Sequence, residues 1–349
     1  MIEVIDTIEK FDGLQDIWER LENGPEMTIQ QTFRWNRLGW DAIKDDGGSL
    51  FILKWSQDGK GDIVILPLYI DKGGTLRFIF DEHTDHCNSI YGNVGECHFW
   101  PYREAADAII MEPRVHSVRL DKMASNSEAL NYLSVFLAES RVHKTNAYSW
   151  VYTGSEKDFI SAQKQMLSRD RKHFRYLTRK SDGLAFRVVS KKLQAEFPYE
   201  EIVRIRDYMI ANGVRDRNFL NEKQMSFIGA MYDAGFCEIP MLRDDNGVVA
   251  LNIHFVWRDT SLAWIYLGKD MQYGTGVYVK YCADWAKENV GKIDLGTGAY
   301  EYKLLTFRPF LRAVYTLEFE KTKQARIRSS MGRFVVSLKQ LIKEIIAKG

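Results

Sequence analysis

Two segments of this sequence repeat one pattern. Residues 51–80 and 237–266 align without a gap at a constant offset of 186 residues. Each segment reads as a strand, a turn, a second strand, a short turn and a third strand. The aligned turn residues are Asp58 with Asp244 and Gly61 with Gly247. A repeat this long exceeds a solenoid unit and indicates a duplicated domain. Any two antiparallel meanders share alternation and glycine-rich turns, but the matched turn positions and strand lengths favour duplication.

The length of 349 residues also favours two domains over one core. We place the boundary at Gly154-Ser155, where Ser155 can cap the next helix. The expected parts are an N-terminal half, residues 1–154, a C-terminal half, residues 155–320, and a basic amphipathic helix, residues 321–349. Strands mixed with helices predict an α/β class with mixed, mostly antiparallel sheets and flanking helices.

The composition narrows the class of protein. A hydrophobic share of 45% with 13% aromatic residues predicts a globular chain. No uncharged apolar run approaches a membrane span, and the N-terminus lacks the basic and apolar regions of a signal peptide. Cysteines without a CxxC spacing predict a reduced, cytoplasmic protein. They are Cys87, Cys97, Cys237 and Cys282. A net charge of +1 does not suggest a general nucleic-acid binder.

A glycine-bearing turn is the strongest candidate for ligand binding. An apolar strand ends near Tyr266, the turn Gly274-Thr275-Gly276 follows, and an amphipathic pattern predicts a helix through about Asn289. The free N–H groups and the dipole of a helix start favour an anion such as a phosphate. The alternative is an ordinary strand-to-helix turn that needs glycine for its backbone.

This region resembles the CelD-like, cellulose-biosynthesis-associated acetyltransferase family of the GNAT superfamily, which is similar to Fem-type aminoacyltransferases. The residues that carry the resemblance are Gly268 and Asp270 after the strand, Gly276 at the helix start, and the run Asp294-Leu295-Gly296 with Tyr302-Lys303. The resemblance covers most of the chain, most weakly before Phe51 and after Glu320. It implies tandem GNAT-like half-domains, with the catalytic machinery in the C-terminal half.

The resemblance also implies a donor and a donor site. Acyl-CoA, typically acetyl-CoA, is the expected cosubstrate, with no permanently bound cofactor. The expected contacts of the donor are Gly268, Gly274, Thr275 and Gly276. Met271 stands where the GNAT pattern usually has Arg or Gln, so this position departs from the family.

A second set of candidates could perform the chemistry. Asp294, Tyr302 and Lys303 follow the predicted helix, where they can supply or accept a proton or stabilise charge. Alternatively, Asp294 caps the glycine turn after it and the rings pack on the sheet. His254 shares a strand face with Asn252, and the resemblance implies a general base in this strand. A polar strand face covered by a helix explains His254 equally well.

Three other features have weaker functional interpretations. The loop from His83 to His98 matches no standard zinc spacing, so we predict no metal and prefer a substrate-facing loop. The basic run 164–180 can meet phosphates, including those of tRNA, or be a solvated helix face. The apolar stripe and lysines of the final helix suit peripheral contact with the inner face of a membrane, or packing on its own domain.

The resemblance implies an acyltransferase that moves an acyl group from acyl-CoA to an amino or hydroxyl group of a sugar or cell-envelope polysaccharide precursor. Two alternatives are aminoacyl-tRNA-dependent transfer of the Fem type, and a non-catalytic accessory protein of polysaccharide synthesis. The sequence has no Walker loop, Rossmann fingerprint, nucleophile elbow or HExxH motif. Direct acyl transfer needs none of these motifs, because it depends on positioning and charge stabilisation.

Overall fold

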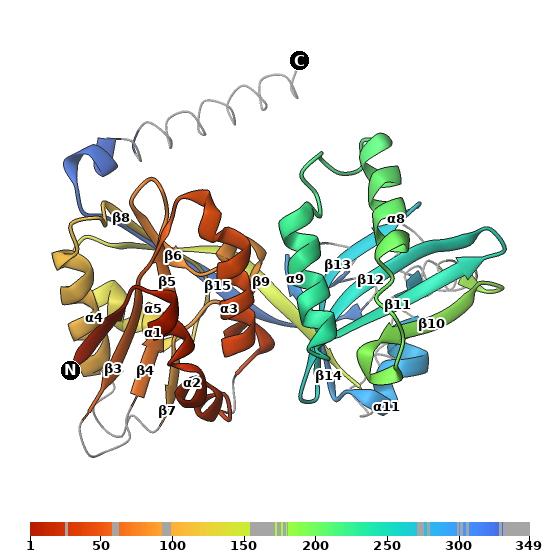
Figure 1. Cartoon of the computed structure of the whole chain (residues 1–349), viewed down its shortest axis with the longest axis horizontal. Coiled ribbons are helices and arrows are strands. Elements are labelled where there is room, and N and C mark those ends of the chain that lie inside the picture. Colours follow the sequence, from red (N-terminus) through yellow and green to blue (C-terminus); the bar gives the residue numbers. More distant parts are fainter. Residues whose placement is uncertain are drawn as a thin grey trace. The chain divides into compact units, whose positions relative to one another are not determined.

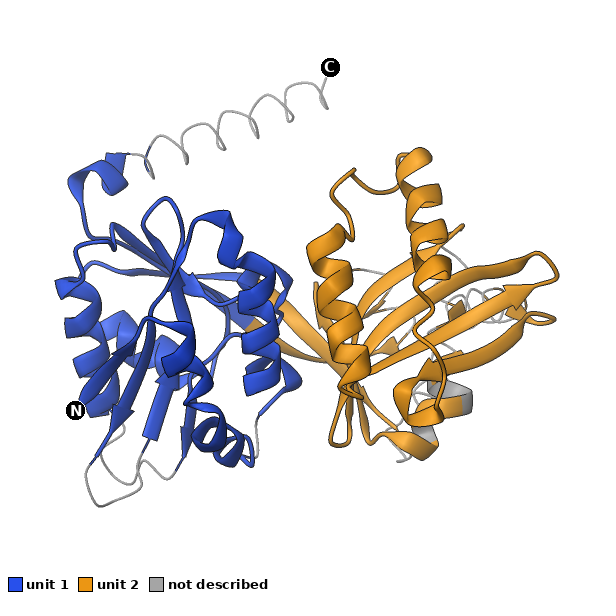
Figure 2. Ribbon diagram, viewed as in Figure 1, with its two compact units in different colours: residues 1–145, 314–349 blue, residues 146–313 orange. Residues whose placement is uncertain are grey.

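The computed structural model divides the chain into two compact units (Figures 1 and 2). Unit 1 comprises residues 1–145 and 314–349, and unit 2 comprises residues 146–313. The structure describes residues 1–24, 27–57, 63–92, 99–153, 181–270, 280–298 and 307–327, with the single positions 172, 176, 179, 276, 277, 300, 303, 304 and 330. In these residues no helix has the length and apolar character needed to cross a membrane.

Unit 1 contains a four-stranded sheet in the order β1-β3-β4-β7 and a second set of strands in the order β15-β8-β6-β5-β2. The strands are β1 (Ile2–Ile5), β2 (Ser49–Leu50), β3 (Ile52–Ser56), β4 (Ile63–Leu66), β5 (Leu68–Ile70), β6 (Thr75–Phe78), β7 (Ile90–Gly92), β8 (Ser117–Ala124) and β15 (Phe310–Glu320). The helices are α1 (Ile8–Asp12), α2 (Gln15–Leu21), α3 (Phe33–Ile43), α4 (Phe99–Met111) and α5 (Glu128–Phe136), with short 3₁₀ turns η1 (Ile29–Gln31), η2 (Lys44–Asp46) and η3 (Asp81–His83).

The core of unit 1 contains residues of both strand sets and of helices α4 and α5. Alternate residues of each strand point to one face, so Leu76 of β6, Leu120 of β8 and Leu317 of β15 are buried together. Ser127 begins α5 by accepting the Leu130 N–H at 3.2 Å. The opposite face of these strands carries polar residues.

Unit 2 has strands in the order β10-β11-β12-β13-β14-β9. They are β9 (Arg141–Tyr152), β10 (Ala185–Ser190), β11 (Cys237–Asp244), β12 (Gly247–Trp257), β13 (Thr260–Gly268) and β14 (Lys292–Thr297). The helices whose bounds lie in the described residues are α8 (Tyr199–Ala211), α9 (Glu222–Asp233), the π-helical η5 (Tyr281–Ala286) and α11 (Lys287–Asn289), with a 3₁₀ turn η4 (Lys191–Leu193). Figure 1 shows α8 and α9 beside each other over the long strands of this sheet.

The start of α9 shows how sequence sets an element boundary. Asn221 accepts the N–H of Gln224 at 3.1 Å, and the Gln224 side chain accepts the N–H of Asn221 at 3.0 Å. This capping box satisfies two helix-end donors that would otherwise lack partners. The sequence predicts a helix over 221–234, and α9 begins at Glu222, directly after its cap residue Asn221.

The two units share a strand plan that agrees with the repeat in the sequence. In unit 1 the meander ends in β6, which pairs in parallel with β8 at Thr75–Ser117 and Leu76–Val118. In unit 2 the meander ends in β13, which pairs in parallel with β14 from Thr260–Lys292 to Leu262–Asp294. A helix-containing crossover lies between the two strands of each pair, as parallel pairing requires.

The two meanders differ at one proline. In unit 2, β12 is one continuous strand between β11 and β13. In unit 1 the corresponding strand breaks at Pro67 into β4, which pairs with β3, and β5, which pairs with β6 in the other sheet. Proline has no N–H to donate to a ladder, so a strand change there costs no backbone hydrogen bond.

Each unit receives one strand from the other half of the sequence. β9 follows the helices of unit 1, but its end pairs with β14, with Trp150 opposite Asp294. β15 follows β14, yet its end pairs with β8, with Leu317 opposite Leu120. The units therefore divide within β9 at residues 145–146, before the expected boundary at Gly154, and residues 314–320 belong to unit 1. Strands are expected from the sequence over 147–153 and 314–320, but a local sequence pattern carries no information about a strand's partner.

Candidate active site

The parallel pair in unit 2 is the centre of the candidate site. β13 and β14 pair at three positions, the last of which is Leu262–Asp294. β13 continues to Gly268 and β14 to Thr297. Among these described residues the ladder does not resume, so the two strands stop sharing hydrogen bonds where their C-terminal parts begin. The chain after β13 leads to the helix that includes Gly276.

Asp294 lies at the point where the ladder ends. It is the third residue of β14 instead of the strand end that the sequence suggested, and it is 5% exposed. Its Oδ1 accepts the Gly296 N–H at 2.8 Å, and Gly296 has a φ of +69° that favours glycine. The capping alternative is therefore present in the structure. It does not exclude chemistry, because each oxygen of a carboxylate can accept more than one hydrogen bond.

Lys303 lies beside the end of β14. Its side chain is buried, and Nζ donates to the carbonyl oxygens of Leu295 at 2.5 Å and Thr297 at 3.0 Å. The ammonium group also lies 5.3 Å from the centre of the Tyr300 ring. Asp294 and Lys303 thus bring opposite charges to the same stretch of β14. Tyr302, their predicted companion, lies outside the described residues.

An aromatic surface lies on the same face as Asp294. We call it the aromatic platform; it consists of Tyr148, Trp150 and Tyr152 of β9, and Phe310 and Arg312 of β15. The Trp150 ring centre lies 5.3 Å from that of Tyr148 and 5.8 Å from that of Phe310. The Arg312 guanidinium lies 5.8 Å from the centres of both the Tyr148 and Trp150 rings. Tyr152 and Phe310 are 41% and 43% exposed, and such exposed aromatic groups often mark binding surfaces.

The aromatic platform as a unit could not be predicted from the sequence. Tyr148, Trp150 and Tyr152 alternate along one predicted strand, so their common face was visible. Phe310 is far from them in sequence, and only the pairing of β9 with β14 places Trp150 opposite Asp294. Directly opposite residues of antiparallel strands have neighbouring side chains.

His254 occupies a buried polar network on the opposite face of the unit 2 sheet. Its Nδ1 lies 2.9 Å from Ser261 Oγ, and its ring centre is 4.2 Å from that of Tyr281. Tyr281 donates to Glu238 Oε2 at 2.9 Å, and Trp285 Nε1 donates to the same oxygen at 3.0 Å. Tyr281 and Trp285 come from the π-helical turn η5, a distortion that often occurs near functional sites.

The surroundings of His254 disfavour a direct role in proton transfer. Its side chain is fully buried, and burial lowers the pKa of the imidazole to about 3. A general base works best with a pKa near the working pH and must reach the proton it removes. A helix covers this strand face, as in the structural alternative that the sequence also allowed for His254. A catalytic role for His254 stays a prediction.

Asn252, two residues before His254, has an unusual environment. It is fully buried, and among the described residues neither side-chain amide atom has a hydrogen-bond partner. On the same face, Ala250 clusters with Val277 and His254 contacts Tyr281. Asn252 therefore shares a strand face with residues that pack on Val277 and Tyr281. A buried amide without partners costs folding free energy, so this position is a candidate for contact with a ligand.

The predicted donor glycines are only partly described. A Cβ added at Gly268 would lie 2.6 Å from Tyr266 Oη, and one at Gly276 would lie 3.2 Å from the Cβ of Ser181. Close packing alone therefore favours glycine at both positions. Gly274 and Thr275 lie outside the described residues. Both interpretations of the turn stay predictions.

The corresponding end of the parallel pair in unit 1 is filled by its own side chains. Asp81 follows β6, is buried, and accepts from Arg77 Nε at 2.9 Å through Oδ2. Within the described part of the chain, its Oδ1 has no hydrogen-bond partner. Lys122 Nζ donates to the Asp81 carbonyl oxygen at 2.8 Å. Burial raises the pKa of Asp81 to about 6. Unit 1 thus differs from unit 2 at the place where a donor would enter.

Other expectations from the sequence fall largely outside the described residues. Cys97 and His98 of the polar loop do so, and within the described parts of the chain no group of three or more His, Cys, Asp or Glu side chains could hold a metal ion. Most of the basic run 164–180, including Ser168 and Arg175, and the final helix beyond residue 330 also lie outside them.

Comparison with known proteins identifies the fold. No protein-family model and no curated protein sequence matches the chain. Among solved structures, the chain is similar to the C-terminal DUF2156 domain of a protein described as a lysylphosphatidylglycerol synthetase from Agrobacterium fabrum, with 14% identity, a TM-score of 0.54, and coverage of 94% of this chain and 96% of that chain. It is similar to FemX at 10% identity and a TM-score of 0.54, over 90% of this chain and 96% of that chain.

A tandem GNAT protein from the clavulanic acid biosynthesis pathway is also similar, at 10% identity and a TM-score of 0.50, over 92% of this chain and 99% of that chain. Identities this low show the fold alone. The chain has a tandem GNAT-like α/β fold with mixed sheets and flanking helices, which confirms the predicted fold class. Nothing in these similarities favours the CelD-like family over other proteins with this fold.

Proposed function

We propose that this chain is a CelD-like acyltransferase that binds acyl-CoA in unit 2 and transfers the acyl group to an amino or hydroxyl group of a sugar or cell-envelope precursor. The observation that carries the proposal is the early end of the β13–β14 ladder at Leu262–Asp294. Beyond the end of the ladder, the N–H and C=O groups on the facing edges of β13 and β14 can form hydrogen bonds with the extended part of acyl-CoA that ends in the thioester. The helix start near Gly276 offers N–H groups to phosphates.

The residues around this point suit direct transfer to an amine. The amine nitrogen attacks the thioester carbonyl carbon, a C–N bond forms, and the C–S bond breaks. In the proposal the amine's proton passes to the Asp294 carboxylate, and coenzyme A leaves as the thiolate. Positioning of the two substrates supplies much of the rate gain in such reactions. The aromatic platform gives the acceptor a surface beside Asp294 on which a ring can pack.

The first test of this proposal asks whether acyl-CoA binds the protein and whether it binds at the helix start near Gly276. Acetyl-CoA should raise the melting temperature of the protein, since a ligand at one hundred times its Kd adds about 2.7 kcal/mol to the free energy of unfolding. Gly276→Asp should weaken acetyl-CoA binding at least tenfold in calorimetry, because it adds a carboxylate beside the expected phosphates.

Gly276→Ala is the matched control for this substitution. Its methyl group meets Ser181 at the same 3.2 Å as the Cβ of aspartate, but it adds no charge. We expect the alanine variant to keep acetyl-CoA affinity within a few fold. Equal loss in both variants would show that packing, and not charge, is responsible. Stabilisation by aminoacyl-tRNA but not by acetyl-CoA would favour the Fem-type alternative, and stabilisation by neither would favour the accessory-protein alternative.

A further inference from the structure

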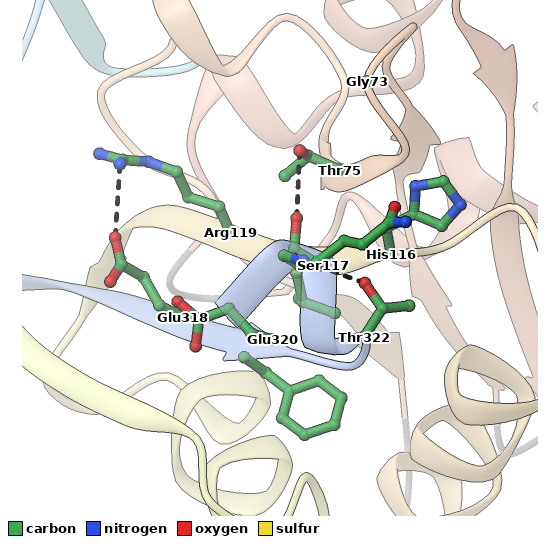
Figure 3. Close-up of a pocket in the computed structure, with 12 residues that line it drawn as sticks. Gly73, Thr75, His116, Ser117, Arg119, Glu318, Glu320 and Thr322 are labelled. Atoms are coloured by element: carbon green, nitrogen blue, oxygen red, sulfur yellow. Dashed lines mark hydrogen bonds and ion pairs between the residues drawn. The ribbon is translucent and has the colours of Figure 1, made fainter. Parts of the chain in front are cut away.

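The pocket at the start of β8 in unit 1 is neutralised by its own ion pairs. It has a volume of about 250 Å³, and its lining includes Arg119, Glu318 and Glu320. Figure 3 shows Arg119 paired with Glu318, and the two groups are 3.4 Å apart. Arg141 pairs with Glu320 and lies 3.5 Å from Glu318. These charges have partners within the protein, so they leave no charged end for a ligand.

One end of the aromatic platform of unit 2 lies beyond Asp294 and is exposed. Trp150 lies opposite Asp294 on β14, and Tyr152 lies opposite Lys292, two residues earlier on that strand. Such residues are about 6.6 Å apart along a strand and share a face. Tyr152 and Phe310 are 41% and 43% exposed, and their ring centres are 5.4 Å apart. We call Tyr152, Phe310 and Lys292 the outer subsite.

Lys292 brings an uncompensated positive charge to the outer subsite. Its side chain neighbours that of Tyr152, because the two residues are directly opposite on antiparallel strands. Among the residues that the structure describes, its ammonium group forms no ion pair or hydrogen bond. The backbone N–H of Lys292 donates to the Asp259 carbonyl at 3.0 Å, and Oδ1 of the Asp259 carboxylate accepts from Thr260 Oγ1 at 3.2 Å. A ligand here therefore meets an available donor beside two aromatic rings.

These groups suit a sugar ring better than the other ligands of exposed aromatic surfaces. The C–H face of a pyranose packs on an aromatic ring, and its hydroxyl oxygens accept hydrogen bonds from an ammonium group. A fatty chain would cover the Lys292 ammonium group without giving it a partner. Single-stranded RNA also combines stacked rings with positive charge, but its phosphates would lie on the same face as the Asp294 carboxylate, which repels them. The outer subsite therefore favours a carbohydrate.

The distance between the outer subsite and Asp294 sets a minimum size for this carbohydrate. A sugar unit whose amino or hydroxyl group reaches Asp294 leaves Tyr152 and Phe310 for the next unit along the strand. We infer that the acceptor is a glycan of at least two sugar units, the first at Asp294 and the second on the outer subsite, where Lys292 donates to its hydroxyl groups. The inference rests on the proposed acyl transfer and names the class of its acceptor. The outer subsite supplies binding and no proton transfer, so it should act on KM rather than on kcat.

Steady-state kinetics of the full chain with two acceptors tests this inference. The acceptors are glucosamine and its β-1,4-linked dimer, with acetyl-CoA as the donor and release of the coenzyme A thiol as the readout. The dimer should have a KM about tenfold lower than that of glucosamine, the effect of one additional ring contact, at a similar kcat. Equal kcat/KM values for the two acceptors would overturn the inference and leave the proposed acyl transfer intact.

Two substitutions test the outer subsite. Phe310→Ala should lower the preference for the dimer, which is the ratio of the two kcat/KM values, by about tenfold. Lys292→Met keeps the apolar stem of the side chain but removes the ammonium group, and it should lower the same ratio several fold. Loss of folded protein lowers both kcat/KM values equally, so the ratio reports the subsite alone. Leu311→Ala is the matched control, because it removes a 49% exposed side chain from the opposite face of β15 and should keep the parental ratio.

Other outcomes would overturn the inference in distinguishable ways. Unchanged preference for the dimer in both variants would remove the outer subsite from acceptor binding. Inhibition of the transfer by a short single-stranded RNA, without any preference for the dimer, would assign this surface to nucleic acid. Binding of acetyl-CoA without transfer to either sugar would overturn the inference but keep the donor site. Absence of acetyl-CoA binding would remove the proposed function and, with it, this inference.

Discussion

Asp294 and His254 show how the surroundings of a polar residue decide what it can do. Both are buried on neighbouring parts of the unit 2 sheet. Asp294 lies opposite Trp150, on the face with the partly exposed aromatic platform, where the ladder between β13 and β14 ends. His254 lies under η5, bound to Ser261 and packed on Tyr281. Asp294 is therefore the better candidate for contact with a substrate.

Substitution of Asp294 by asparagine separates chemistry from folding. The asparagine Oδ1 can still accept the Gly296 N–H, so the turn and the melting temperature should change little. If Asp294 accepts the acceptor's proton, the variant should lose roughly a hundredfold or more in turnover. Release of free coenzyme A thiol measures the rate, and a thermal melt measures the stability. Parental turnover in this variant, or a large loss of melting temperature, would assign Asp294 a structural role.

At the scale of elements, the network under η5 joins four segments of unit 2. Glu238 of β11, His254 of β12 and Ser261 of β13 are linked through Tyr281 of the π-helical turn. Such a network fixes the register of the helix on the sheet, because each buried polar group depends on its partners. The network also makes the stability of the folded protein sensitive to acid, because the His254 imidazole is buried in its neutral form.

His254→Asn should make the protein less sensitive to acid. The folded-state pKa is about 3, whereas an unfolded histidine has a pKa of about 6.5. Below pH 6.5 the unfolded chain binds a proton that the folded chain does not. The contribution of neutral His254 to stability is therefore complete above pH 6.5 and is lost progressively as the pH falls toward 3. Asparagine does not titrate, so the variant avoids this loss.

Urea unfolding at pH 7 and pH 5 checks this expectation. The parent should lose more free energy of unfolding between these pH values than the variant, by up to about 1.4 kcal/mol per pH unit. Equal losses in the two proteins would show that His254 can be protonated in the folded state, as its predicted role of general base requires. That outcome would return His254 to the list of catalytic candidates.

Strands and helices were largely predictable from the sequence, but their partners were not. The expected strand over 185–190, meander over 236–267 and helix over 221–234 correspond to β10, β11–β13 and α9. The break at Pro67 was not predicted, because a proline within a strand pattern does not show that two sheets meet there. The candidate site shows the same limit. Asp294 and Lys303 are close in sequence, so their proximity could be predicted. Which face of the sheet η5 covers could not be predicted, because it depends on contacts between residues far apart in sequence.

At the scale of the whole molecule, the exchange of strands couples the two halves of the sequence. β8 of unit 1 depends on β15, which comes from the far end of the chain, and β14 of unit 2 depends on β9. A strand edge left without its partner exposes a row of unpaired backbone groups and invites aggregation. Leu317 and Phe319 of β15 also belong to the buried core of unit 1.

Residues 1–154 expressed alone should therefore fail to form a stable unit, although they correspond to the half that the sequence predicts. This fragment keeps the part of β9 that pairs with unit 2 and lacks β15. Residues 1–145 joined through a flexible linker to residues 310–327 should fold, because the linker returns β15 to β8 at only a modest entropic cost. Thermal melts followed by circular dichroism compare the two fragments.

The linked fragment with Leu317→Asp is the control, and it should melt at a lower temperature because the substitution places a charge in the core. A cooperative melt of residues 1–154 at the temperature of the linked fragment would contradict this account, since it would show that β8 does not need its partner from the other half of the sequence.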